Sequence, residues 1–262
     1  MKIFKAFCRQ QFHVLTAYRL SFWMTLFNTF IRIYAYVMLW KILFNQNTSL
    51  FNIDLDQMLI YSIASIAMSQ SFTWWDGPHL YVVENVKNGK IITDFLKPID
   101  FEIQLFYRGF SQAIVNFVCY TIPTFLISII VLRIKIPFNN ICLTIVFLFL
   151  GYVILFLLNY ILALISFITL DLEGYLHIFH AIIAFCSGQV IPLWLYPGFL
   201  RHIIDFLPFK AVFFIPLSIF IADSSINVVN SLLIQILWIL VLFLIGRVIW
   251  KFVFKKMIIQ GG

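Results

Sequence analysis

Charged side chains are scarce in this sequence. Asp, Glu, Lys and Arg make up 11% of its 262 residues, whereas hydrophobic residues make up 63%. Too few polar side chains are present to cover a water-facing surface, which excludes a soluble monomer. Acidic residues are the scarcer class, 11 against 18 Lys and Arg. Because the basic residues cluster at the ends of apolar segments, they indicate membrane topology, and we expect no nucleic-acid partner.

The residues of the common catalytic and metal-binding motifs are also missing. Cys8, Cys119, Cys142 and Cys186 are isolated, which disfavours a disulfide framework and a metal or redox site. The Gly89-Lys90 pair has neither the upstream glycine nor the following hydroxyl of an ATP-binding P-loop. We therefore expect no catalytic residue, no metal site and no cofactor in this chain, and we do not expect an enzyme.

Long apolar runs make up most of the sequence. Since a helix needs about 20 apolar residues to cross a bilayer, the chain is predicted to be an all-α polytopic membrane protein with about six crossings. The predicted spans are residues 20–44, 57–75, 105–132, 141–168, 176–195 and 228–250. Together with their connections they form a single transmembrane domain, 20–262.

Residues 1–19 precede the first span and have the pattern of an amphipathic surface helix. Lys2, Lys5, Arg9 and His13 recur at steps of three or four, with Phe4 and Phe7 among the residues on the other side. With the N-terminus in the cytoplasm, twelve Lys and Arg residues lie inside and five outside. This distribution favours an orientation with both termini inside.

Residues 197–224 are apolar enough for a seventh crossing. Pro208 and Pro216 would break such a helix, and Arg201, Asp205 and Lys210 would lie at depth. We therefore expect two short helices that dip into the outer leaflet and return, with an ordinary extracellular loop as the alternative.

The loop 76–102 carries most of the mixed-sign charge. Within it, Leu80 to Val86 is predicted to form a helix that Gly89 terminates, and Ile91 to Leu96 is a second short apolar segment. Such a loop is typical of a docking surface for a cytoplasmic partner, although a solvated connector has the same composition.

A few polar residues fall inside the predicted spans. Arg108, Gln112, Asn116, Tyr120 and Thr124 recur every four residues in the third span, and Asn28 and Arg32 lie in the first. The third-span stripe indicates either hydrogen bonds between helices or a polar pathway. Arg32 must either extend its side chain toward the membrane interface or pair with an anion, which would come from another subunit, a lipid phosphate or a substrate.

Three stretches resemble the membrane permease of type-2 ATP-binding-cassette (ABC) transporters, which are mostly exporters. They are the surface helix Phe4 to Tyr18 followed by Tyr18-Arg19-Leu20-Ser21-Phe22-Trp23, the loop Glu84 to Ile99, and Ser187 to Leu193 continuing through Tyr196-Pro197 to Leu207-Pro208-Phe209. The resemblance covers nearly the whole chain. The second and third stretches resemble a bacterial branch of the family that is often encoded with a second permease and a separate ATPase.

The resemblance implies specific roles. The loop after the second span would be the coupling helix, which places Glu84, Asn85, Lys87, Gly89, Lys90, Asp94, Lys97 and Pro98 against an ATPase subunit. The outer re-entrant element would include Gly188, Pro192, Pro197, Pro208 and Phe209. ATP and magnesium would bind to partner chains, which are two soluble P-loop ATPase subunits, and a second permease, identical or related, would complete the transporter among membrane lipids.

The implied function is export of an amphipathic or apolar cargo, such as a lipid, peptide or drug, across a bacterial cell membrane. The alternative is an ion-coupled secondary carrier that works without an ATPase. All eleven carboxylates lie in loops or at segment ends, away from the midplane where such carriers bind their coupling ion. A membrane-embedded enzyme or scaffold is disfavoured by the absence of an acid, base or metal cluster within the bilayer.

Overall fold

The structure is a computed structural model that describes residues 2–46, 54–72, 77–133, 140–169, 173–221 and 227–261. These residues form helices, turns and short connections with no strand among them, which confirms the predicted all-α class. The first half comprises α1 (Lys2–Ala17), α2 (Arg19–Gln46), α3 (Leu55–Ser71), α4 (Pro78–Lys87), α5 (Ile92–Phe95), α6 (Phe101–Asn116), the π-helical turn η1 (Phe117–Thr121) and α7 (Ile122–Leu132). The second half comprises α8 (Ile141–Ile165), α9 (Glu173–Cys186), η3 (Leu193–Leu195), α10 (Gly198–Asp205), η4 (Pro208–Ala211), α11 (Phe214–Phe220) and α12 (Val228–Gly261).

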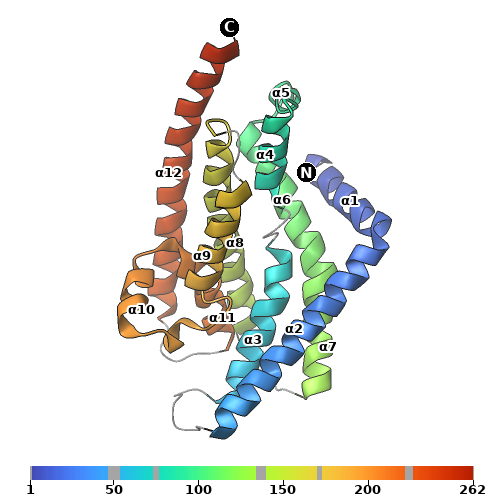
Figure 1. Cartoon of the computed structure of the whole chain (residues 1–262), viewed down its shortest axis with the longest axis vertical. Helices are drawn as coiled ribbons and strands as arrows, with labels where there is room; N and C mark the ends of the chain where they lie inside the picture. The colour runs from blue at the N-terminus through green and yellow to red at the C-terminus, as the bar shows by residue number, and fades with distance from the viewer. Residues whose placement is uncertain are drawn as a thin grey trace.

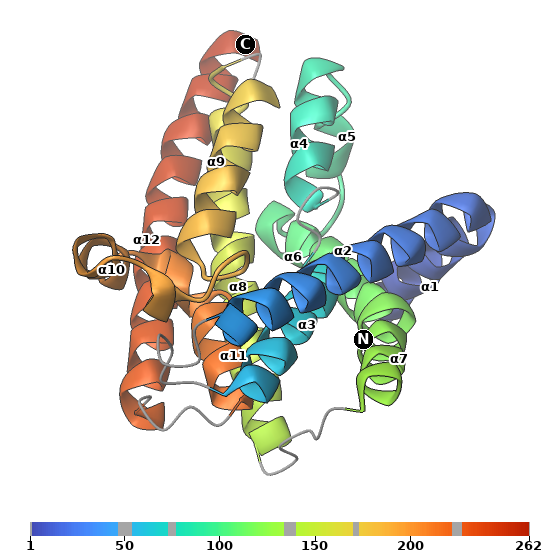
Figure 2. The same ribbon diagram turned by 60° about the horizontal axis from the view of Figure 1, so that its bottom comes forward.

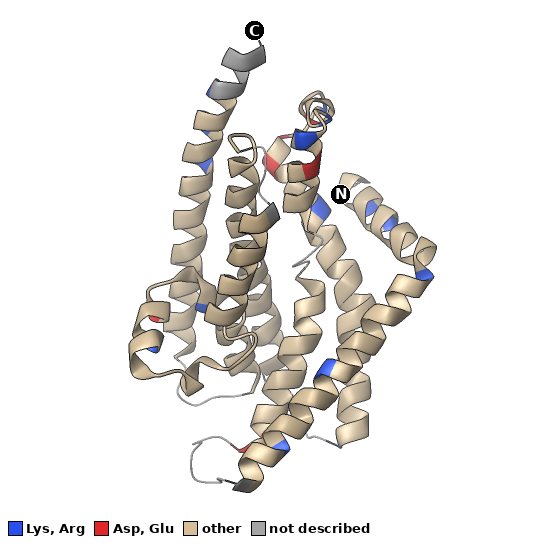
Figure 3. Ribbon diagram, viewed as in Figure 1, with Lys and Arg blue, Asp and Glu red and all other residues tan. Residues whose placement is uncertain are grey.

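The long helices form an elongated bundle with distinct ends (Figure 1). The α4–α5 segment, the start of α1 and the end of α12 lie at one end, which we call the α4–α5 end (Figure 1). Basic and acidic positions gather on α4 and α5, and further basic positions lie on α1 and near the end of α12 (Figure 3). The end of α2, the start of α3 and the end of α7 lie at the opposite end (Figure 1).

Four helical segments are long and apolar enough to cross a bilayer: α2, the continuous α6–η1–α7, α8 and α12. They are sufficient to define a multi-pass membrane protein. The predicted second and fifth spans correspond to α3 and α9, which have 17 and 14 residues in their described parts. Residues 73–76, at the junction of the second span and the following loop, lie outside the described residues. The number of crossings and their orientation stay predictions.

The bundle core is built around α8, which packs against α4, α11 and α12. Ile154, Leu155 and Leu164 of α8 are almost completely buried. Gly151 allows the backbones to approach closely, since a Cβ added there would lie 2.6 Å from the carbonyl oxygen of Val212. Glycine at this position therefore determines how near α11 and η4 come to the central helix.

The helix α6–η1–α7 contains the π-helical turn in its middle. Residues spaced by four drift by about 40° per step around an ordinary α-helix, so the predicted stripe from Arg108 to Thr124 would wind away from one face. The wider π turn at Phe117–Thr121 counteracts this drift, and Tyr120 and Thr124 both remain buried. Pro123 lies inside this continuous helix, directly after the π-helical turn, and its nitrogen has no hydrogen to donate to a carbonyl of the preceding turn.

The chain between α9 and α11 leaves the bundle and returns to the same point. Gly188 adopts φ +76° just after α9 ends, a left-handed conformation that terminates the helix. The backbone N–H of Phe214 then donates to the carbonyl of Ser187 at 2.9 Å, so α11 begins where α9 ends. The fifth predicted span, 176–195, thus contains a helix that ends at Cys186.

The returning part is the α10–α11 element (Gly198–Phe220), which corresponds to the described part of the predicted outer element; residues 222–224 lie outside the described residues. The chain bends by 78° between α10 and the helical segment that starts at Pro208, so this break is where we expected it. The chain also turns at Val212 and Phe213, between η4 and α11, just before Pro216. Pro216 is the third residue of α11, where the backbone nitrogen has no partner within the helix.

Candidate coupling site and neighbouring cavities

The α4–α5 segment forms two short helices at one end of the bundle (Figures 1 and 2). Pro78 begins α4, and the helix ends at Lys87 with Asn88 as its C-cap. Gly89 follows with φ +66°, the left-handed conformation predicted for it. The sequence therefore encodes both the start and the end of α4 locally.

Asp94 of α5 ties the segment to α6. Its carboxylate, 1% exposed, accepts hydrogen bonds from the Tyr81 hydroxyl at 2.7 Å, from Gln104 Nε2 at 3.0 Å and from Lys97 Nζ at 2.5 Å. Burial by itself raises the pKa of Asp94, but these three donors together hold the pKa below its ordinary value. Asp94 is therefore an ionised internal link between α4, α5 and α6.

Two further contacts hold α4 against the bundle. The buried rings of His79 and His180 of α9 lie edge to face, with centroids 5.0 Å apart, and His180 contacts Asn159 of α8 at 3.2 Å. Pro78 packs on Gly109 of α6, where an added Cβ would lie 2.9 Å from the Pro78 ring. Movement of α4 must therefore be accompanied by movement of the helices on both sides.

The opposite face of the segment is exposed and partly apolar. Leu96 is 80% exposed and Ile92 is 63% exposed, although Ile91 beside them is buried. Lys87, Lys90 and Lys97 surround these two side chains in the sequence and are also exposed. We call Ile92 and Leu96, with the three lysines, the tip.

The structure divides the predicted coupling residues into two groups. Those on the exposed face are Glu84, Lys87, Gly89, Lys90, Lys97 and Pro98, and Asn85 is half-buried. Asp94 points inward, so it contributes to the attachment of the segment and not to an exposed surface. Sequence reasoning missed Ile92 and Leu96, whose spacing of four residues was the available signal that they share a helix face.

The polar stripe of the third span contacts neighbouring helices. Asn116 Nδ2 donates to the carbonyl of Gln70 in α3 at 3.3 Å, and Gln70 Nε2 donates to Thr29 of α2 at 2.8 Å. The ring of Tyr120 lies 5.0 Å from that of Phe22. These contacts favour hydrogen bonding and packing between helices over a continuous polar pathway.

Arg108 and Gln112, at the α4–α5 end of the stripe, line a separate polar cavity with α1 and α4. Asn28 and Arg32 are exposed on α2, and within the described residues no hydrogen bond or ion pair joins them to the stripe. The predicted set therefore does not form one site.

Residues of the predicted outer element are held mainly through backbone atoms. The Gly188 carbonyl accepts from the Tyr61 hydroxyl at 2.7 Å, and the next carbonyl, of Gln189, accepts from Ser65 at 2.6 Å. Pro192, Pro208 and Phe209 are buried, whereas Pro197 is exposed as the N-cap of α10. Gly188, Pro192 and Phe209 thus belong to the packed part of this region.

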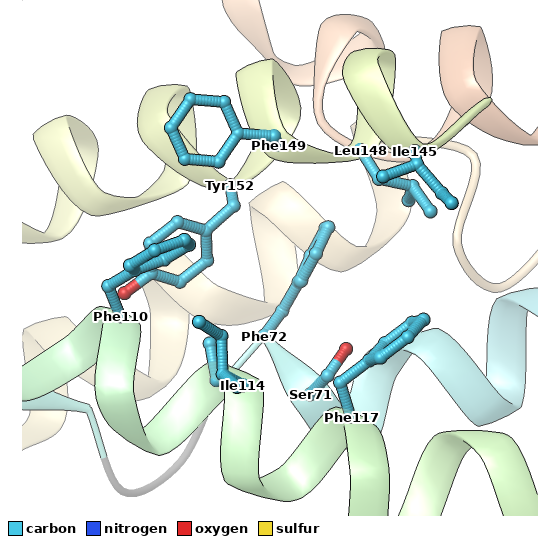
Figure 4. A pocket seen from close by; sticks show the side chains of 10 residues that line it. Ser71, Phe72, Phe110, Ile114, Phe117, Ile145, Leu148, Phe149 and Tyr152 are labelled. Carbon is cyan, nitrogen blue, oxygen red and sulfur yellow. The ribbon is translucent and has the colours of Figure 1, made fainter. Parts of the chain in front are cut away.

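Two apolar cavities lie between α6–α7 and α8. One, of about 200 Å³, is lined by aromatic rings that include Phe72, Phe110 and Tyr152 (Figure 4). The other, of about 240 Å³, lies beside η1 and shares Phe117 and Leu148 with the first. Both are suited to apolar groups. Within the described ranges no three His, Cys, Asp or Glu side chains are grouped to hold a metal ion.

A multi-pass helical membrane protein with a folded, partly apolar tip outside its bundle is the class that these features define. Comparison with known families identifies it further: the family model described as ABC-2 family transporter protein matches residues 30–261. The chain therefore belongs to the ABC-2 family of transporter membrane proteins, as the resemblance in its sequence predicted. A search of curated proteins found no match.

Proposed function

We propose that this chain is the transmembrane permease subunit of an ABC exporter in a bacterial cell membrane. Two P-loop ATPase subunits, encoded separately, would bind ATP and magnesium and supply the energy, and a second permease would complete the transporter. The observation that carries the proposal is the tip, an exposed apolar pair beside lysines on a segment anchored to α6 by Asp94.

The proposed orientation has about six crossings with both termini in the cytoplasm. Two observations support it. The two ends of the chain and the α4–α5 segment lie at the same end of the bundle (Figure 1). Basic positions on α1, on α12 and in the α4–α5 segment are concentrated at that end (Figure 3), which is the distribution expected of a cytoplasmic face.

The proposed mechanism begins when ATP brings the two ATPase subunits together. An ATPase groove that holds Ile92 and Leu96 would then displace the tip. Because Asp94 bonds to both Tyr81 and Gln104, and Pro78 packs on Gly109, the displacement reaches α6 directly. The permease then changes between two packed states whose populations depend on the bound nucleotide.

The cargo we propose is amphipathic or apolar. The two cavities beside α6–α7 have apolar and aromatic linings, and hold about 200 and 240 Å³. They are large enough for part of an acyl chain or for an aromatic group, and too apolar for a free ion. This favours a lipid, hydrophobic peptide or drug over a small polar solute.

The test is co-purification of the tagged full chain from its native membranes in mild detergent. The unaltered chain should bring with it a P-loop ATPase, identified by mass spectrometry and by hydrolysis of Mg-ATP. Leu96→Asp, alone and with Ile92→Asp, should reduce the amount of co-purified ATPase at least about tenfold. The substitution places a charge where the proposed ATPase groove would bury an apolar side chain.

Phe206→Asp is the matched control, since Phe206 is also strongly exposed (82%) but lies in the α10–α11 element. It should leave ATPase recovery unchanged. Equal recovery with Leu96→Asp, or transport by the purified chain with an ion gradient and no ATPase, would contradict the proposed function.

A further inference from the structure

A polar cavity of about 270 Å³ lies between α1, α4 and α6. Its lining includes Gln11 from α1, Tyr81 and Glu84 from α4, and Arg108 and Gln112 from α6. The cavity thus differs in chemistry from the two apolar cavities that the continuous α6–η1–α7 helix also borders. Polar side chains from three helices converge here without forming hydrogen bonds to one another in the described structure.

Arg108 dominates the electrostatics of this cavity. Its guanidinium lies over the Tyr81 ring, 3.7 Å from the centroid, and is 5.7 Å from the Phe7 ring of α1. The Nε–H group is buried without a hydrogen-bond partner, and no carboxylate within the described residues forms an ion pair with Arg108. A buried guanidinium donor is costly to leave unpaired, so the cavity favours a ligand that supplies an oxyanion.

The place of the cavity indicates where that oxyanion comes from. Phe4 of α1 packs on Tyr107 and Phe110 of α6, with ring centroids 6.0 and 5.8 Å apart. This fixes α1 beside Arg108, and α1 carries the amphipathic pattern of a helix that lies in the head-group layer. Arg108 is therefore at the depth of phospholipid phosphates, which guanidinium groups bind through paired hydrogen bonds.

Glu84 is a second residue that determines which ligand the cavity favours. Its side chain is exposed and lines the cavity from α4, one helical turn beyond Tyr81. A carboxylate at this position opposes a ligand that is purely anionic, and it attracts a positive group attached to the phosphate. The two charges, Arg108 and Glu84, match the two charges of a zwitterionic head group.

We propose that this cavity binds the phosphoethanolamine head group of a membrane phospholipid, with Arg108 on the phosphate and Glu84 on the ammonium. Gln11 and Gln112 supply additional hydrogen bonds to the phosphate oxygens. The bound lipid joins α1 to α4 and α6, so it stabilises the position of the segment that carries the tip. The site requires neither ATP nor an ATPase subunit.

The experiment is native mass spectrometry of the full chain in detergent, with equal amounts of phosphatidylethanolamine and phosphatidylglycerol added. The unaltered protein should retain phosphatidylethanolamine preferentially. Arg108→Gln should weaken its retention by at least about tenfold, the effect of losing a charged hydrogen bond, and Arg108→Lys should weaken it less. Glu84→Gln should abolish the preference between the two lipids while retaining binding.

Arg201→Gln is the matched control, because Arg201 is exposed on α10 and does not line the cavity. Equal retention of both lipids by the unaltered protein, or unchanged retention by a folded Arg108→Gln variant, would overturn the proposal. Displacement of the lipid by low-millimolar inorganic phosphate would also overturn it, in favour of a soluble ligand. Since no ATPase is present, failure here leaves the proposed function unaffected.

Discussion

Two regions of the bundle are held together by different chemistry. At the α4–α5 end, side-chain hydrogen bonds converge on the buried carboxylate of Asp94. In the α9–α11 region, side chains bond to backbone carbonyls, as Tyr61 does to Gly188 and Gln235 does to both Phe147 and Ala211. Side-chain networks can rearrange as a unit, whereas backbone contacts at van der Waals distance resist movement. The comparison indicates a movable α4–α5 end and a rigid α9–α11 region.

The largest expected effect comes from overfilling the rigid region. Gly151→Val places new carbon atoms against the Val212 carbonyl, which an added Cβ would approach to 2.6 Å. We expect destabilisation of about 3 kcal/mol or more, because neither backbone can move without disrupting the core. The thermal unfolding midpoint in detergent measures this. Gly174→Val, in open space on α9, should change it little.

A smaller effect on stability, but a larger one on coupling, is expected at Asp94. Asp94→Asn keeps the shape but loses the charge that three donors share, which should cost about 2 kcal/mol. Cargo-stimulated ATP hydrolysis of the assembled transporter should fall further than the unfolding midpoint does. Asp100→Asn, at an exposed neighbour, is the control. Normal stimulation in a folded Asp94→Asn transporter would refute the internal link.

Acidification should weaken the α4–α5 end through His79. Burial, and then the charge of His180, lower the pKa of folded His79 to about 3, well below the ordinary 6.5. The unfolded chain therefore takes up a proton that the folded chain does not, and stability falls as the pH drops below 6.5 toward 3.

The free energy of unfolding should fall by at most about 1.4 kcal/mol per pH unit. Unfolding midpoints measured between pH 7 and 5 test it, and His79→Phe should flatten the dependence. His202→Gln, at an exposed histidine, should not. An unaltered slope in His79→Phe would mean that other groups cause the effect.

The smallest effect compares two glycines in the same backbone conformation. Gly89 (φ +66°) has open space around it, so Gly89→Ala should cost only the left-handed strain, about 1 kcal/mol, and Gly89→Asn less. Gly188 (φ +76°) has Tyr61 Oη 3.0 Å from an added Cβ, so Gly188→Ala should lower the unfolding midpoint more. Equal shifts at the two glycines would contradict the division into movable and rigid regions.

Structural features that depend on a few neighbouring residues could be predicted from the sequence. The Gly89 cap and the break before Pro208 follow from residues whose backbone preferences act within one turn. The end of α9 at Cys186 was not predictable from hydropathy, because apolar residues resume soon after Ser187-Gly188-Gln189. Hydropathy measures the preference of a segment for lipid and does not show whether its helix is continuous.

The sequence also did not indicate that the Asp94 side chain points into the bundle. Asp94 carries a charge in a loop rich in charges, and nothing within one helical turn distinguishes it from Lys90 or Glu84. Its burial depends on Tyr81 and Gln104, which the fold brings together from more distant positions. The exposure of Ile92 and Leu96 follows from the same arrangement, since the face that Asp94 occupies is no longer available to them.

The hydrogen bond from Phe214 to Ser187 has a consequence for sequence evolution. It closes a ring of chain around α10, and the entropy of closing such a ring grows only slowly with its length, by about 0.6 kcal/mol for each doubling. Extra residues at the exposed turn between α10 and η4 would therefore be tolerated while the closing contact stays in place. Homologous chains should vary most in length at this turn, and it is the natural point at which to insert a fluorescent reporter.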